Sequence, residues 1–139
     1  MGERPTGNAR ATKYRYPPIV RMTNTAIEGG DTSFEDMIKD IKLGVYACDM
    51  YGGQTAMENF SFSSAYAYMI RDGQIAEMVK DVILSGNLFT TLMNIDAIGN
   101  DFGWSHSGGM CGGKGQGGGL PVTFGAPHVR IQNVVIGGR

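Results

Sequence analysis

The sequence predicts an α+β fold in which antiparallel strands form a sheet or barrel-like sheet, joined by two short helices and a glycine-rich loop. Aromatic side chains spaced by two within residues 60–68 indicate strand rather than helix. Asp72-Gly73 then supplies a strong signal for a tight turn between antiparallel strands. Helical patterns are few and do not alternate with strands, which disfavours a doubly wound parallel sheet.

The N-terminal segment, residues 1–18, is polar, basic and contains prolines. We expect it to be an extended arm, or the end of a linker, with little regular structure. The domain itself is then expected over residues 19–139, and a weak alternation over residues 19–25 predicts a short first strand.

The first helix is predicted over residues 33–43. Ser33 is a good N-cap residue, and acidic residues follow it in the first turn, where they face the positive end of the helix. From Phe34 onward, apolar side chains recur at i, i+3, i+4 and i+7, which places them on one helical face. Gly44 is the expected C-cap.

Three strands are predicted after this helix. The first covers Val45–Tyr51 and is expected to end at Gly52-Gly53. The second covers Gln54–Ile70, where the aromatic side chains have the spacing of sheet residues. After the Asp72-Gly73 turn, Ile75–Ile83 is expected to return as its antiparallel partner.

A second short helix is predicted over residues 87–95, with Asn87 as its N-cap. Residues 99–119 are expected to be loop. Two final strands are predicted at Leu120–Phe124 and Val129–Ile136.

Charge and targeting signals exclude several classes of partner. Twelve basic and thirteen acidic residues give a formal net charge of −1, which argues against nucleic acid or an anionic membrane surface as a partner. No apolar run has the length of a signal peptide or a membrane span. The two cysteines form no CxxC pair, so we expect a cytoplasmic protein with reduced thiols.

Glycine is unusually abundant, with 22 residues in the chain, and the region after Gly99 is especially rich in it. Gly108–Lys114 formally matches a P-loop, and Gly113–Gly118 formally matches a dinucleotide-binding loop. Gly115 stands where the P-loop needs Ser or Thr, and neither match has a buried strand before it and a helix after it. We therefore treat phosphate binding as a minor hypothesis.

Cys111 is the residue of this loop whose side chain could react or bind a metal. A thiolate near Lys114 could act as a nucleophile or a metal ligand, and the alternative is an inert thiol in a flexible loop. Cys48 lies in an apolar, strand-like segment, where an inert role is favoured. The side chains that could supply a base or further ligands are His106, His128, Asp96 and Asp101. Their spacing marks no complete site within this chain.

Five segments of the sequence occur in the order found in the TldD/PmbA family. The chain resembles the C-terminal part of these proteins, known as modulators of DNA gyrase and understood as metallopeptidases, over about Gly7 to Gly138. The segments are Arg21-Met22-Thr23-Asn24-Thr25, Phe60-Ser61-Phe62, Gly86-Asn87, Cys111-Gly112-Gly113-Lys114-Gly115-Gln116 and Val134-Val135-Ile136-Gly137-Gly138.

The resemblance implies a zinc site completed by Cys111. In the family, two histidines of an H-E-x-x-x-H helix and a C-terminal cysteine bind zinc, and the glutamate acts as general base. Cys111 matches the position of that cysteine, with Gly112, Gly113 and Lys114 as its supporting loop. The catalytic subunit forms a dimer with a related zinc-free subunit and acts on unfolded peptides. Because PmbA-type subunits lack the metal site, Cys111 favours the TldD side.

The departure from the family is the absence of H-E-x-x-x-H from this sequence. We therefore expect no catalytic residue in the chain and no peptide hydrolysis by the chain alone. Its expected partners are a peptide substrate and either the upstream half of the same protein or a paralogous subunit in a dimer. The alternative function is a non-catalytic structural or dimerisation module of the PmbA type.

Overall fold

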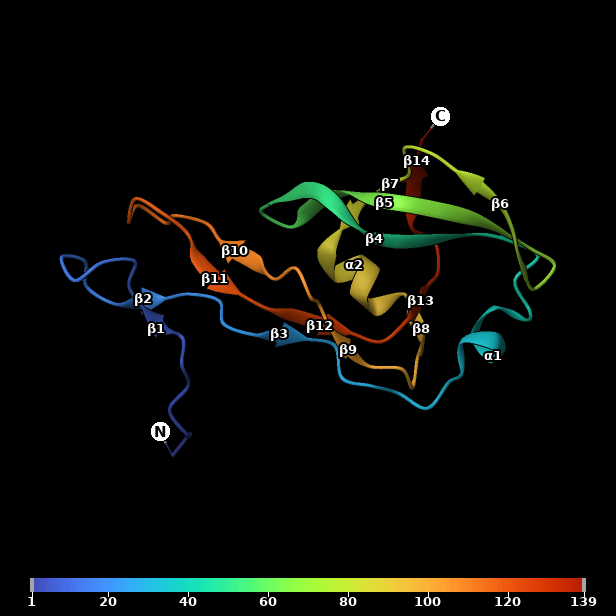
Figure 1. The fold of residues 1–139 in the computed structure, drawn as a ribbon. Helices are drawn as coiled ribbons and strands as arrows, with labels where there is room; N and C mark the ends of the chain where they lie inside the picture. The colour runs from blue at the N-terminus through green and yellow to red at the C-terminus, as the bar shows by residue number, and fades with distance from the viewer. Residues whose placement is uncertain (1, 139) are drawn as a thin grey trace. The chain divides into compact units, whose positions relative to one another are not determined.

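The computed structural model describes residues 2–138, and the chain divides into two compact units. One unit combines the chain up to Gly29 with Phe102–Pro127, and the other combines Gly30–Asp101 with the chain from His128 onward. Antiparallel pairing dominates and two short helices are present, so the predicted α+β class is confirmed (Figure 1). Within residues 2–138 the sheets stay open rather than closing into a barrel, and no helix is long and apolar enough to cross a membrane.

The second unit is built on a five-stranded antiparallel sheet. Its strands are β4 (Leu43–Ala56), β5 (Asn59–Arg71), β6 (Gln74–Val79), β7 (Ile83–Asn87) and β14 (Val135–Gly137). The order is β14-β7-β5-β4, and β6 also pairs with β5. Among the described residues β4 pairs with β5 alone, so β4 is a long edge strand.

The Asp72-Gly73 turn connects β5 to β6 as predicted. Arg71 pairs with Gln74, and the two turn residues have φ values of 46° and 77°. Both values lie in the left-handed region, which is the geometry of a type I′ hairpin turn. The turn also donates its two backbone N–H groups to the carbonyl oxygens of Ile41 and Lys42, at 2.8 and 3.0 Å.

The first helix is shorter than predicted. The helix α1 (Phe34–Ile38) begins as expected, with the Ser33 hydroxyl accepting from the Asp36 amide at 3.1 Å. It ends five residues before position 43, and the carbonyl oxygens of Ile41 and Lys42 that follow it accept hydrogen bonds from the Asp72-Gly73 turn instead. Gly44, the predicted C-cap, lies within β4 instead.

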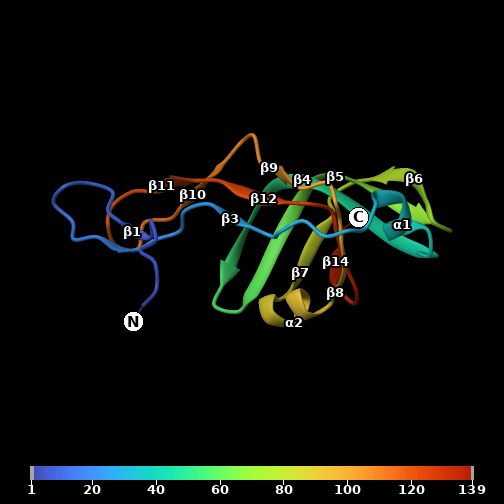
Figure 2. The ribbon, with the colours of Figure 1, turned by 90° about the horizontal axis from the view of Figure 1, so that it is seen from below.

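The second helix, α2 (Leu88–Met93), agrees with the predicted range 87–95 and follows directly from β7 (Figure 2). The Asn87 side chain caps it by accepting from the Thr90 amide at 3.1 Å. After α2, β8 (Ile95–Ile98) pairs in antiparallel fashion with β13 (Val129–Ile131).

The prediction that Gly52-Gly53 ends a strand is wrong. β4 continues through both glycines to Ala56, and a bulge between Met50 and Gly52 adjusts its pairing with β5. The reversal occurs at Met57-Glu58, inside the segment that was expected to be one strand. Glycine permits a turn, but pairing with the antiparallel strand β5 on both sides of the bulge keeps this backbone extended.

A small apolar core supports this sheet. The buried apolar residues of the second unit come from α1, from β4 and β5, and from the segment before β7. They are Met37, Ile38, Cys48, Ala67, Ile70 and Val82.

The first unit contains only short strands. These are β1 (Ala9–Arg10), β2 (Ile19–Val20), β3 (Thr25–Ala26), β9 (Gly103–Trp104), β10 (Gly109–Cys111), β11 (Leu120–Val122) and β12 (Phe124–Ala126). β12 lies between β3, to which it is parallel, and β9. Residues 99–119 are therefore not all loop as predicted, because β10 pairs with β11 and leaves Gly112–Gly119 as their connection.

Replacing Gly73 by alanine should destabilise the second unit. A Cβ atom there would lie 2.5 Å from the Lys39 carbonyl oxygen, on a backbone with positive φ. We expect the free energy of unfolding in urea to fall by about 1–3 kcal/mol. Gly52→Ala is the matched control, because a Cβ at Gly52 meets nothing within 4 Å. Equal stability of the two variants would contradict this account of the turn.

Candidate functional site

Cys111 is the last residue of β10, where the strand enters the Cys111 loop (Gly112–Gly119). It pairs with Leu120 of β11, and 6% of its surface is exposed. The preceding residue, Met110, is 66% exposed, because successive side chains of a strand point to opposite faces. The sulfur is therefore fixed on the inner side of the hairpin.

Arg21 holds this end of the hairpin with its guanidinium group. Nη2 donates to the carbonyl oxygens of Cys111 and Gly112, both at 2.7 Å, and Nε donates to the Cys111 sulfur at 3.5 Å. Nη1 donates to the Gln116 side-chain oxygen at 3.1 Å. Arg21 is 1% exposed, so this group is withdrawn from water.

Gln116, which is also buried, ties the Cys111 loop to the N-terminal arm. Its Nε2 donates to the Pro17 carbonyl at 2.9 Å, and its Oε1 accepts from the Thr12 amide at 3.3 Å. The Thr12 hydroxyl donates to the Gln116 carbonyl at 2.7 Å. Lys114, at the tip of the loop, donates to the Val20 carbonyl at 3.1 Å.

The surroundings of Cys111 favour the charged form of its thiol. The hydrogen bond from Arg21 lowers the pKa of Cys111, and a backbone hydrogen bond from Met22 and the charge of Lys114 act in the same direction. Burial opposes the shift without reversing it. The thiolate is the form that acts as nucleophile and metal ligand, and a thiol with a lowered pKa populates it more than a free cysteine does. For Cys48, by contrast, burial raises the pKa.

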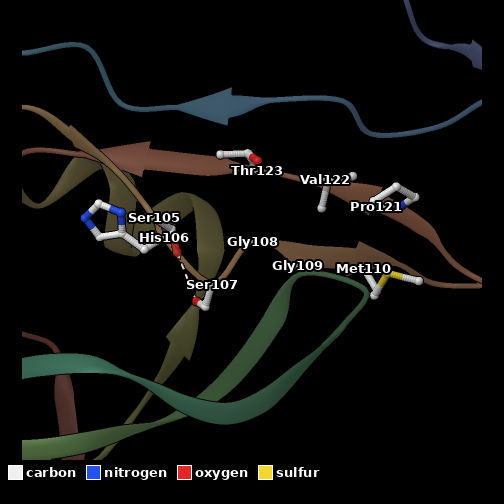
Figure 3. A pocket seen from close by; sticks show the side chains of 9 residues that line it. All are labelled: Ser105, His106, Ser107, Gly108, Gly109, Met110, Pro121, Val122 and Thr123. Carbon is white, nitrogen blue, oxygen red and sulfur yellow. Dashed lines mark hydrogen bonds between the residues drawn. The ribbon is translucent and has the colours of Figure 1, made fainter.

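Among the described residues, His106 forms no hydrogen bond with the Cys111 sulfur, so it is not placed as a base for this thiol. It lines an open pocket together with Ser105–Met110 and Pro121–Thr123, and Cys111 is not among the lining residues. Figure 3 shows the imidazole at the opposite end of this pocket from Met110. The hydroxyl groups of Ser105 and Ser107 are joined by a hydrogen bond of 3.1 Å.

The other sequence candidates are engaged within the second unit. His128 Nδ1 is hydrogen-bonded to the Asp101 carboxylate, and His128 Nε2 shares a 2.7 Å hydrogen bond with the Tyr46 hydroxyl. The two hydrogen bonds to His128 lower the pKa of Asp101. Asp96 pairs with Arg130, which lowers the pKa of that carboxyl too. The hydrogen bonds described here for these side chains are therefore made within the second unit and not to Cys111.

Within the described residues no group of three or more His, Cys, Asp and Glu side chains could hold a metal ion. Cys111 is thus one suitable zinc ligand, and a zinc ion would need its remaining ligands from outside residues 2–138. The phosphate motifs also lack their context, because the Cys111 loop joins two strands and no helix begins at its end.

A family model described as the PmbA/TldA metallopeptidase C-terminal domain matches residues 1–138. The chain belongs to this family. A metalloprotease from Synechocystis is 55% identical over 138 residues, which are 99% of this chain and 29% of that protein. A zinc metalloprotease TldD homolog from Saccharolobus solfataricus is 36% identical over 139 residues, which are 99% of this chain and 30% of that protein. The chain thus spans less than a third of these relatives.

Solved structures of the PmbA/TldA family share the fold. A modulator of a DNA gyrase from Thermotoga maritima aligns with a TM-score of 0.65 and 24% identity, over 98% of this chain and 27% of that one. TldE from Thermococcus kodakarensis aligns with a TM-score of 0.68 and 21% identity, over 95% of this chain and 27% of that one.

Sequence reasoning selected Cys111 in this PmbA/TldA domain but gave no role to Arg21 or Gln116. Both stand in the motif segments that carry the family resemblance, so the segments marked them without explaining them. The feature that identifies Arg21 is its burial without an acidic partner among the described residues, and burial is known only from the folded structure.

Tyr46 offers a test of the packing around its phenol group. Burial raises the pKa of Tyr46 to about 12, so folding favours the neutral phenol. Its contribution to stability is present below the unfolded pKa of about 10 and is lost as pH rises through the folded value. We expect absorbance at alkaline pH to show a tyrosine ionising near 12, absent from Tyr46→Phe and kept in Tyr14→Phe, whose site is fully exposed. Ionisation of all six tyrosines near pH 10 would contradict this.

Proposed function

We propose that this chain is the C-terminal domain of a TldD-like zinc metallopeptidase and that Cys111 supplies one zinc ligand. The observation that carries the proposal is the Cys111 sulfur, buried at the end of β10 and receiving a hydrogen bond from a buried arginine. The match to the metallopeptidase family and the zinc named for the Saccharolobus relative support it. Zinc at such a site would activate a bound water and polarise a peptide carbonyl.

The remaining ligands are proposed to come from an H-E-x-x-x-H helix outside this chain. A thiolate and two imidazoles form an ordinary zinc set that leaves a position open for water. The residues present fit one third of that set and no more, since no three-residue cluster of potential ligands exists in residues 2–138. On this proposal the chain alone hydrolyses no peptide, and its place of action is the cytoplasm, where thiols stay reduced.

Replacing Cys111 by serine in the full-length protein should remove zinc and peptidase activity together. Serine keeps the size of the side chain but is a much weaker zinc ligand than a thiolate. Bound zinc is measured by elemental analysis and activity with an unfolded peptide. Cys48→Ala is the control, because Cys48 lies in the apolar core of the other unit. Full zinc content and activity in Cys111→Ser would reject the ligand assignment.

Part of the peptide groove is proposed to lie along β4. This strand is 14 residues long and has no second partner within residues 2–138, so its outer edge carries free backbone donors and acceptors. An extended peptide can add to such an edge as a further strand. Partner subunits, identical or paralogous, are proposed to complete the groove.

Hydrogen exchange tests the groove. Adding an unfolded peptide to the Cys111→Ser protein, which does not cleave it, should slow amide exchange within Leu43–Ala56. β7, which is paired on both sides, is the internal control and should not change. Protection that is confined to other strands would move the groove away from β4.

A further inference from the structure

Arg21 is buried, and the hydrogen bonds of its guanidinium group are concentrated on one short segment. It is the largest fully buried side chain among the described residues, and every hydrogen bond of its guanidinium group ends on Cys111, Gly112 or Gln116. These acceptors lie 90 to 95 positions away along the chain. The side chain is therefore dedicated to one short segment, the end of β10 and the start of the Cys111 loop.

The positive charge of Arg21 also has no other partner near it than this segment, among the described residues. Within residues 2–138 no carboxylate forms an ion pair with it. Burying a cation without an anionic partner is unfavourable, and three oxygen acceptors offset that desolvation only in part. The sulfur of Cys111 is the one acceptor of the four that can become an anion, and zinc binds it in that form.

The loop that follows Cys111 would be mobile without such contacts. Six of its eight residues are glycine, so its backbone loses more conformational entropy on ordering than an ordinary loop does. Gln116 counteracts this from the far side of the loop, through its hydrogen bonds to Thr12 and Pro17. Arg21 and Gln116 are joined to each other, which makes a single buried network.

We propose that Arg21 and Gln116 are positioning residues that fix the Cys111 sulfur in its ligand geometry before the metal binds. The proposal rests on the proposed function of Cys111 as a zinc ligand. All members of the network belong to one unit, so its hydrogen bonds are made within this chain. Groups that orient a metal ligand typically change metal affinity 10–100-fold when they are mutated.

The test uses full-length apoprotein, with cobalt(II) as a zinc substitute whose absorption reports a bound thiolate. Arg21→Lys keeps the charge but loses the planar fork, so it cannot serve both carbonyls and the sulfur together. Gln116→Leu keeps the volume but removes the link to the arm. Arg15→Lys is the matched control, because Arg15 is exposed and its hydrogen bond and cation–π contact are both with Tyr16.

We expect Arg21→Lys and Gln116→Leu to bind cobalt(II) about 10–100-fold more weakly than the parent protein. Per bound cobalt, their thiolate-to-cobalt charge-transfer band should be weaker or shifted, which a loss of folded protein alone would not produce. Arg15→Lys should match the parent in both readouts. Thr12→Val, which removes one hydrogen bond to Gln116, keeps the test decisive if the stronger variants do not fold.

Two results would overturn the proposal, and they are distinguishable. If Cys111→Ser lacks the band but the Arg21 and Gln116 variants keep the parent's affinity and band, positioning is wrong and the ligand assignment stands. If the parent and Cys111→Ser give the same spectrum, Cys111 is not a ligand and both proposals fail.

Discussion

The burial of the Arg21 guanidinium against the start of the Cys111 loop is the interaction on which the first unit depends. The strands of this unit are two or three residues long, too short to be stable by their own ladders. Its buried side chains include Arg21, Cys111 and Gln116, and these three are hydrogen-bonded to one another. A polar network therefore occupies the place that an apolar core holds in most small domains.

The second unit shows the contrast. Its sheet has strands of up to 14 residues, the buried side chains given above for it are apolar, and the Lys39–Asp36 and Arg71–Glu77 ion pairs lie at its surface. Such a unit tolerates exchange of one apolar side chain for another of similar volume. The network around Arg21 tolerates much less, because removing any member leaves a buried donor or acceptor without a partner. The candidate site at Cys111 thus lies in the unit whose buried contacts are less tolerant of substitution.

The features predicted correctly from sequence are those set by neighbouring residues. Ser33 and Asn87 cap helices, and Asp72-Gly73 forms a turn, because each acts within four positions of itself. Gly52-Gly53 misled the prediction, since the pairing of β4 with β5 overrides the local preference of glycine. Arg21 was out of reach, because its partners are 90 or more positions away. Cys111 was singled out by its motif, not by any pattern of burial.

If Cys111 binds zinc as proposed, with the other ligands coming from outside this chain, its loop meets a physical difficulty that the contacts of the first unit address. A flexible loop would have to lose its freedom when zinc binds, and that entropy would be subtracted from the affinity. On our proposal the ordering occurs when the chain folds, through the hydrogen bonds that extend from the N-terminal arm by way of Gln116 to Arg21. Glycine allows the sharp loop, and the network removes the mobility that glycine brings. On this proposal the two features have to occur together, since either alone would give a poorer ligand.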